Sequence, residues 1–172
     1  MSEEIKRTYD IDAIEYIARL ADGGLRDSLS LLDKCLAYST ELTVENVVSA
    51  LGTVDYHTMF NLLTAVYKHE GDKVISIIET VHSEGKDLKQ FIKDFMGFLL
   101  DVCKYDITKS FDYLQLPNTA DISGALQSYD SEWFACAQRL LDLIVKLNSA
   151  IKWDTQPKVT IEATLLGVIN DG

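Results

Sequence analysis

The chain has 172 residues, of which 47% are apolar and 25% charged, and its formal net charge is −11. This length suffices for one sizeable core or two small ones, and the composition is typical of a globular protein. The negative charge argues against a broad DNA-binding surface, because duplex phosphates require a basic patch. Any contact with DNA must then be local or come from another part of a larger assembly.

The cysteines and the apolar runs argue against a zinc site and against a membrane span. Cys35, Cys103 and Cys136 are widely spaced and include no C-x-x-C pair, so the sequence has no zinc signature. Each lies in an apolar helical pattern, where a free cysteine behaves as a small hydrophobic residue, and this usage suits a reducing cytoplasm. Since no apolar run approaches the roughly 20 residues that span a membrane, we expect a cytoplasmic protein without a membrane partner.

The N-terminal part of the chain predicts three short helices. Asp10 or Asp12 can cap the first helix, which ends at the Gly23-Gly24 pair. The second covers residues 25–38. It places four leucines on one face at about 3.6-residue spacing, namely Leu25, Leu29, Leu32 and Leu36. The third begins after Thr43 and ends at a glycine, residue 52. Three helices with this spacing predict a small bundle.

The remaining residues, 53–172, predict a larger bundle of five or six helices. The stretch 106–130 is less regular than its surroundings and carries one short helix around residues 122–127. Gly97 lies inside a long helix, where glycine costs about 1 kcal/mol against alanine, and this predicts close helix packing at that point. Helices are expected to begin near Asp55, Asp72, Asp87, Asp130 or Ser131, and Pro157. Because no run alternates with a period of two, the sequence predicts an all-α protein.

Arg26 has an unusual place for a cation, in the first turn of the helix over residues 25–38. The N-terminal end of a helix carries a partial positive charge, so an arginine there is mildly unfavourable. Two interpretations remain open. Asp27 can neutralise Arg26 locally, or Arg26 can join the free N–H groups of the helix end in binding an anion, above all a phosphate.

The segment Gly24-Leu25-Arg26-Asp27-Ser28-Leu29-Ser30-Leu31-Leu32-Asp33 resembles the sensor-2 segment in the lid domain of the bacterial DNA polymerase III gamma/tau family. These subunits are the AAA+ motors of the sliding-clamp loader. Ser28 stands where the family has Ala, and Lys34 where it has Gln. In the family, the arginine of this segment reaches toward the phosphates of ATP held by the preceding domain. The resemblance implies that role for Arg26 and for no other residue.

The resemblance extends more loosely over the rest of the chain. Residues 51–55 are similar to the family's junction between lid and collar, and residues 155–166 to its closing collar helix, with Lys158 where the family usually has Arg. The resemblance therefore implies a lid domain over residues 1–52 and a helical collar domain over residues 53–172.

Two sequence features that ATP hydrolysis needs are missing from these 172 residues, a phosphate loop and an acidic strand end that holds magnesium. No G-x-x-x-x-G-K-[ST] phosphate loop occurs, and in the family that loop belongs, with a structural zinc site, to a domain that precedes the lid. We therefore expect a lid-and-collar fragment that is not an enzyme and binds no cofactor or metal by itself. ATP with magnesium is expected only in the full-length subunit, within the DNA polymerase holoenzyme.

The collar implied by the resemblance packs against other clamp-loader subunits, and a homo-oligomer is possible. The sliding clamp and DNA would be contacted only through the full-length complex. In the helix expected from residue 131 to 151, Phe134, Leu143 and Val145 lie outside the main apolar stripe. They are candidates for contact between subunits, unless they complete a broad internal face. The alternative function is a free-standing helical adaptor that binds another protein.

Overall fold

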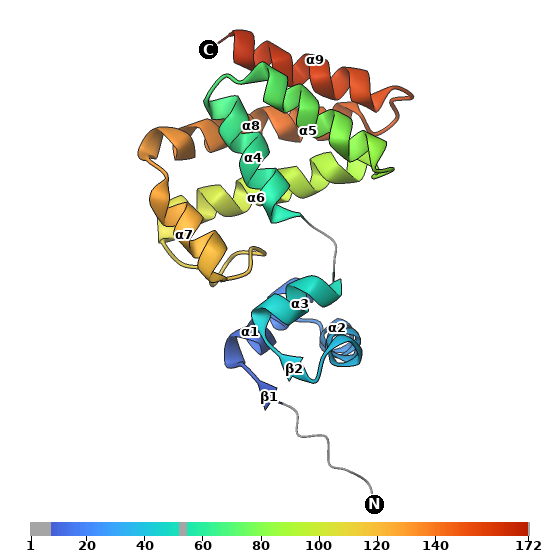
Figure 1. Cartoon of the computed structure of the whole chain (residues 1–172), viewed down its shortest axis with the longest axis vertical. Helices are drawn as coiled ribbons and strands as arrows, with labels where there is room; N and C mark the ends of the chain where they lie inside the picture. Colours follow the sequence, from blue (N-terminus) through green and yellow to red (C-terminus); the bar gives the residue numbers. More distant parts are fainter. Residues whose placement is uncertain (1–7, 52–54, 172) are drawn as a thin grey trace, which may run out of the picture. The chain divides into compact units, whose positions relative to one another are not determined.

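The computed structural model describes residues 8–51 and 55–171, which form nine helices and two very short strands (Figure 1). The all-α class predicted from the sequence is confirmed. By its internal contacts the chain divides into two compact units, one of Met1–Val54 with Thr108–Ser128 and one of Asp55–Ile107 with Tyr129–Gly172. The boundary expected between residues 52 and 53 lies outside the described residues and stays a prediction. In the described part of the chain, no helix is both long and apolar enough to cross a membrane.

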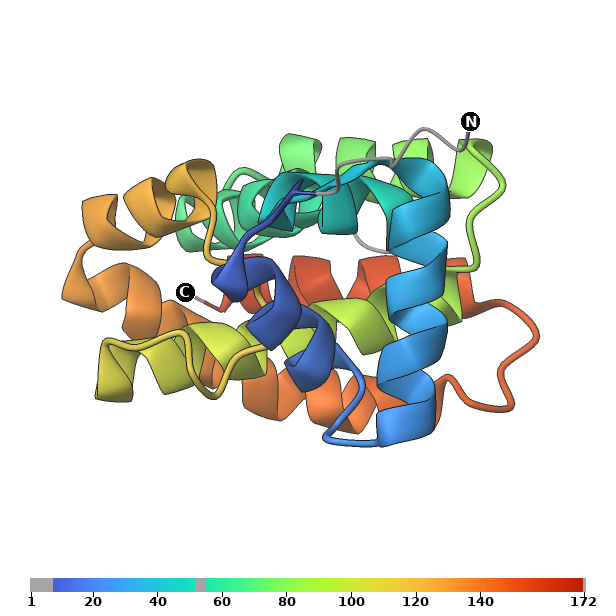
Figure 2. The ribbon, with the colours of Figure 1, turned by 90° about the horizontal axis from the view of Figure 1, so that it is seen from below.

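Three of the four helices described in the first unit, those nearest the N-terminal end of the chain, pack against one another (Figure 2). A two-residue parallel ladder, which the sequence did not predict, pairs Thr8 with Glu41 and Tyr9 with Leu42. The elements of this unit are β1 (Thr8–Tyr9), α1 (Ile11–Leu20), α2 (Leu25–Tyr38), β2 (Glu41–Leu42), α3 (Val44–Leu51) and α7 (Ala120–Ser128). The predicted bounds of α2 are confirmed at both ends.

The core of α1, α2 and α3 differs from the leucine face expected for α2. The buried side chains are Ala13, Tyr16, Ile17, Cys35, Leu42, Val44 and Val47. From α2 only Cys35 is fully buried, with Leu31 and Leu32 packed partly against the cluster. Leu25 and Leu29 are 75% and 51% exposed. Half of the predicted apolar face is therefore uncovered in this chain.

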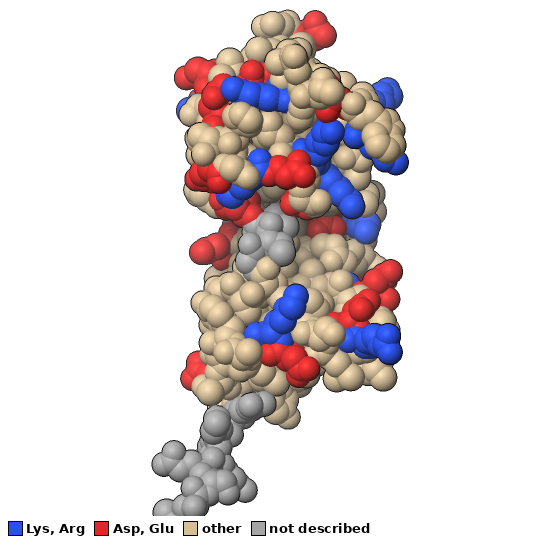
Figure 3. Space-filling model, turned by 90° about the vertical axis from the view of Figure 1, so that its right-hand side faces the viewer, with Lys and Arg blue, Asp and Glu red and all other residues tan. Residues whose placement is uncertain are grey.

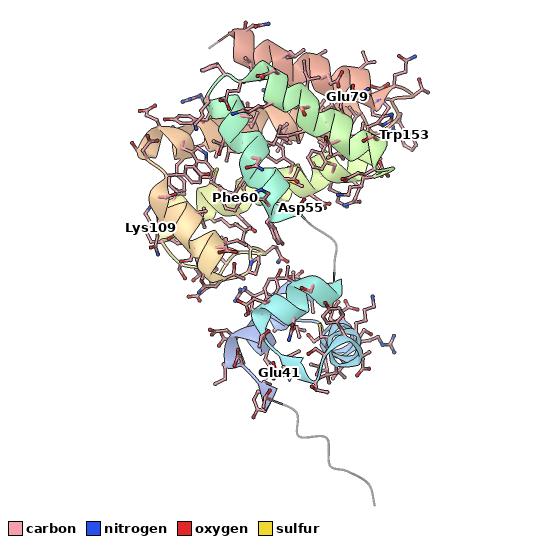
Figure 4. The ribbon with its side chains drawn as sticks, viewed as in Figure 1. Glu41, Asp55, Phe60, Glu79, Lys109 and Trp153 are labelled. Carbon is pink, nitrogen blue, oxygen red and sulfur yellow. The ribbon has the colours of Figure 1, made fainter. Side chains whose placement is uncertain are left out.

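Among the described residues, the second unit is a bundle of five helices of 12 to 21 residues. These are α4 (Tyr56–Tyr67), α5 (Gly71–Ser83), α6 (Leu88–Thr108, whose last residue falls to the first unit), α8 (Ser131–Ala150) and α9 (Pro157–Asn170). Helix α9 lies beside α5, and α4 contacts α5, α8 and α9 (Figures 1 and 2). An ion pair between Lys158 and Glu79 also joins α9 to α5 (Figure 4). The core of this unit combines aliphatic side chains with an aromatic group, in which Phe60 and Phe98 are in edge-to-face contact at 4.9 Å.

Side-chain caps fix several of the helix starts in this unit, as the sequence predicted. Asp55 stands at the N-terminal end of α4 and accepts a hydrogen bond from Thr58 N at 3.2 Å (Figure 4). Asp130 accepts in the same way from Trp133 N at 2.9 Å at the start of α8. Such caps stabilise a helix by about 1 kcal/mol, because they satisfy N–H groups that have no partner inside the helix.

The close packing predicted at Gly97 is wrong. A Cβ atom placed on Gly97 would meet no atom within 4 Å among its described surroundings, and the residue is exposed on α6. The glycine therefore makes no room for a neighbouring helix of this chain.

Candidate functional site

The turn between α1 and α2 leads into residues 24–33, the segment that resembles sensor 2. Asp22 and Gly23 both have left-handed backbone angles, with φ of 51° and 74°, and glycine adopts such an angle without steric cost. A Cβ atom on Gly24 would lie only 3.3 Å from the carbonyl oxygen of Ala21, so glycine also permits a close approach there. The turn is closed by a hydrogen bond from Gly24 N to Ala21 O at 3.0 Å. These two glycines let the chain reverse and begin α2 immediately.

Arg26 is exposed in the first turn of α2. Among the described residues it makes no ion pair, so the structure shows no local neutralisation by Asp27 within 4.0 Å. Leu25 and Leu29 lie near it along the same helix and are exposed as well. The guanidinium group is therefore free to donate to an anion, and two apolar side chains beside it are free to contact a partner.

Charge does not concentrate on the face of the molecule shown in Figure 3. There acidic and basic side chains are interspersed over both units, without a single-sign patch. Within the part of the chain that the structure describes, no group of three or more His, Cys, Asp or Glu side chains could hold a metal ion. The net charge of the chain is −11, so any anion that Arg26 binds is held by a local contact.

The three candidates on α8 fall into different environments. Phe134 is 6% exposed and meets the Trp133 ring edge-to-face, with 5.2 Å between ring centroids. This environment favours the internal-face alternative for Phe134. Leu143 is half-buried, whereas Val145 is 46% exposed. Of the three, Leu143 and Val145 have side-chain surface left for a partner.

A pocket of about 650 Å³ opens between α4, α8 and α9, and the sequence did not reveal it. Apolar side chains that include Val66, Leu140 and Leu143 line it, and charged groups such as Arg139 and Lys146 stand among them. Cys136 lines the same pocket, and its burial raises the pKa of its thiol. The pocket is assembled from three helices distant in sequence, so no local motif could signal it. Leu143, which lines the pocket, is a contact candidate from the sequence alone, because it lies outside the main apolar stripe of α8.

The sequence also did not reveal a tie, formed by two hydrogen bonds, between the last turn of α1 and a segment 95 residues away. Arg19 Nε donates a hydrogen bond to the carbonyl oxygen of Leu114 at 3.0 Å. In return, Gln115 Nε2 donates to the carbonyl oxygen of Arg19 at 3.2 Å. Both partners belong to the first compact unit.

A small helical unit whose glycine turn exposes an arginine, joined to a larger helical bundle, is the arrangement that the resemblance to a clamp-loader lid and collar implies. The family model for the ATPase lid domain of the DNA polymerase III clamp loader subunit matches residues 2–41. The model for domain III of the DNA polymerase III subunits gamma and tau matches residues 42–170. This second match covers well over half of the chain, so the chain belongs to the DNA polymerase III gamma and tau subunit family, and the resemblance seen in its sequence is confirmed.

Individual relatives agree with this assignment. The chain is 23% identical to the DNA polymerase III subunit tau of Bacillus subtilis over 158 residues, which cover 91% of this chain and 28% of that protein. It is 30% identical to the tau subunit of Escherichia coli over 88 residues, 51% of this chain and 14% of that protein. A more distant likeness, 20% over 122 residues, joins it to replication factor C subunit 4 of Encephalitozoon cuniculi, covering 71% of this chain and 40% of that protein. The chain thus spans about a quarter of the length of the Bacillus relative and less of the Escherichia one.

Proposed function

We propose that this chain is the lid and collar of a clamp-loader subunit, which couples the ATP state of an AAA+ core to loading of the sliding clamp in DNA replication. The observation that carries the proposal is the exposed Arg26, held at the start of α2 by a glycine turn inside the region that matches an ATPase lid. A guanidinium group in this position can donate to phosphate oxygens together with the first N–H groups of the helix.

The coupling follows from a difference between nucleotide states. An arginine that contacts the γ-phosphate of ATP loses this partner in ADP, so the lid is drawn toward the nucleotide in one state and released in the other. ATP and magnesium would be held mainly by the phosphate loop of the core, because one arginine supplies too few contacts to bind a nucleotide tightly. Leu25 and Leu29 would pack on that core, which accounts for their exposure in this chain.

The second unit would hold neighbouring subunits in register. Val145 and Leu143 offer apolar surface on α8, and Leu143 also lines the pocket between α4, α8 and α9. Exposed apolar side chains gain free energy when a partner covers them, by about 25 cal/mol for each Å² removed from water. Contacts with the sliding clamp and with DNA would be made by the complete loader.

The test is an Arg26→Ala substitution in the complete clamp loader assembled with this protein. We expect ATP-dependent clamp loading to fall by about tenfold or more, since a charge-assisted hydrogen bond contributes about 1.5–3 kcal/mol, while ADP affinity stays unchanged. Lys34→Ala removes an equal charge from an exposed position on the same helix and serves as the control. Loading at the wild-type rate by the Arg26→Ala loader would refute the ATP-sensing role.

A further inference from the structure

We propose that Arg19 is the positioning residue for Arg26, and that it acts by tying the α1–α2 turn to the segment Asp112–Gln115. This inference rests on the proposed function, because it assigns to Arg19 the orientation of the arginine that senses the nucleotide. Arg19 itself touches no nucleotide in this proposal. It fixes the backbone from which α2 departs.

The tie consists of two reciprocal hydrogen bonds. Arg19 donates through Nε to the carbonyl oxygen of Leu114 at 3.0 Å, and Gln115 donates through its amide to the carbonyl oxygen of Arg19 at 3.2 Å. The Leu114 residue is fully buried, so its carbonyl lies where a lost donor is hard for water to replace. Each of the two segments thus holds the other at a defined distance.

The tie falls at the place where the turn begins. The carbonyl of Arg19, to which Gln115 donates, also accepts the backbone N–H of Asp22 at 3.1 Å, and the neighbouring carbonyl of Ala18 accepts that of Gly23 at 3.2 Å. The last carbonyls of a helix have no partner inside it, so these bonds define how α1 ends. Only four residues separate the end of α1 from the start of α2. A shift of the Arg19 carbonyl therefore passes directly to the first turn of α2, where Arg26 lies.

The surroundings of the turn leave it room to move when the tie is broken. A shallow hollow of about 390 Å³ lies between the α1–α2 turn and residues 112–115, and Arg19 lines it. The guanidinium group also lies over the Tyr16 ring, 5.6 Å from its centroid, which holds the side chain toward its partner. Packing therefore does not fill the space beside the turn, and the two hydrogen bonds to residues 112–115 add to the backbone hydrogen bonds that hold it.

The position of the tie would couple residues 112–115 to the orientation of Arg26. Residues 112–115 fall inside the range 42–170 that matches domain III, yet they pack in the same compact unit as α1 and α2. Movement of this segment would change the orientation of Arg26, and by thermodynamic linkage a γ-phosphate bound by Arg26 would stabilise one position of the segment. Domain III would in this way respond to the nucleotide through the turn.

The experiment uses the complete clamp loader assembled with this protein and four variants: Arg19→Met, Arg19→Lys, Arg26→Ala and the Arg19→Met/Arg26→Ala double variant. Methionine matches the arginine side chain only as far as Nε and removes its donors, whereas lysine keeps a donor that can reach a carbonyl. We expect Arg19→Met to reduce ATP-dependent loading about three- to tenfold, the range of one lost hydrogen bond, and to weaken ATP binding but not ADP binding. Arg19→Lys should restore part of the loss.

The double variant separates positioning from simple damage to the fold. If Arg19 acts through Arg26, the double variant loads the clamp no more slowly than Arg26→Ala alone, because the two effects are not additive. Additive losses, equal weakening of ATP and ADP binding, or normal loading by Arg19→Met would each overturn the inference. If Arg19→Met fails to fold, Gln115→Met removes the reciprocal donor and is judged by the same ATP-to-ADP comparison.

The Arg26→Ala variant tells the two proposals apart. Wild-type loading by Arg26→Ala refutes the proposed ATP-sensing function, and the inference falls with it. A slow Arg26→Ala loader combined with a normal Arg19→Met loader leaves the proposed function standing and refutes the positioning role alone.

Discussion

The indole nitrogen of Trp133 donates a hydrogen bond to the hydroxyl of Thr64 at 3.2 Å and thereby joins α8 to α4. The same hydroxyl donates to the phenol oxygen of Tyr129 at 3.2 Å. The rings of Tyr129 and Trp133 are stacked, with 3.9 Å between centroids and 4° between planes. One threonine therefore serves two aromatic side chains, and Trp133, which is fully buried, meets its need for a polar partner inside the core.

Replacing Thr64 with valine should destabilise the second unit. The substitution keeps the shape of the side chain but leaves the indole N–H of Trp133 without an acceptor, and a buried unsatisfied donor costs about 1–3 kcal/mol. The measurement is the free energy of unfolding in urea, followed by tryptophan fluorescence. Thr80→Val is the control, because Thr80 is exposed and its hydroxyl donates only to a carbonyl of its own helix, at 2.8 Å. A loss no larger for Thr64→Val than for Thr80→Val would show that the indole hydrogen bond contributes nothing.

Gly97→Ala should raise the stability of the chain. The position lies in the interior of α6, is exposed and has open space around the added Cβ atom. Alanine is favoured over glycine in such a position by about 0.5–1 kcal/mol, mostly because the unfolded chain loses freedom. Thermal unfolding of the two proteins checks this, and an unchanged or lower midpoint would contradict it. If the same substitution impairs assembly of the clamp loader, Gly97 faces a neighbouring subunit.

The helices themselves could be predicted from the sequence because their signals are local. Aspartates at the starts of α4 and α8, the glycine pair before α2 and the proline at the start of α9 act within one turn of their own position. The bounds of α2 follow from such signals at both ends.

Which apolar residues become buried could not be predicted in the same way. Periodicity shows that α2 is amphipathic, but it gives no sign of whether Leu25 and Leu29 are covered within this chain or by a partner. The tie from Arg19 to Leu114 spans 95 residues, and a hydrogen bond to a backbone carbonyl leaves no trace in residue types. The ladder of β1 and β2 is too short for an alternating pattern to show.

Asp154 should make the stability of α9 depend on pH in the acid range. Its carboxylate accepts a hydrogen bond from the Thr160 hydroxyl and another from Gln156 N at 2.8 Å, and these two bonds lower its pKa. A carboxyl whose pKa is lowered by folding adds stability that is complete above its unfolded pKa of about 4. That stability is lost as the pH falls through the lower folded value.

The prediction is tested by comparing Asp154→Asn with the natural chain at pH 6 and at pH 3. At pH 6 the variant should unfold more easily, and at pH 3 the difference between the two should shrink. Asp33→Asn, an exposed position on α2, controls for the loss of one negative charge. A difference that stays constant between the two pH values would contradict the role assigned to the carboxylate.

Phe134 and Val145 lie on the same helix, α8, and should respond to substitution in opposite ways. Phe134→Ala removes a buried ring that packs on Trp133, so the free energy of unfolding should fall by about 3–5 kcal/mol. Val145→Glu places a charge on a half-exposed position, so helicity and stability should change little.

If α8 contacts a neighbouring subunit, the same Val145→Glu charge would weaken association, which sedimentation of the mixed clamp-loader subunits measures. Leu143→Glu should also weaken association, and Thr80→Glu on α5 serves as the exposed control. Unfolding of the Val145→Glu and Leu143→Glu variants would instead place these side chains in the core, and normal association by both would remove this face of α8 from the assembly.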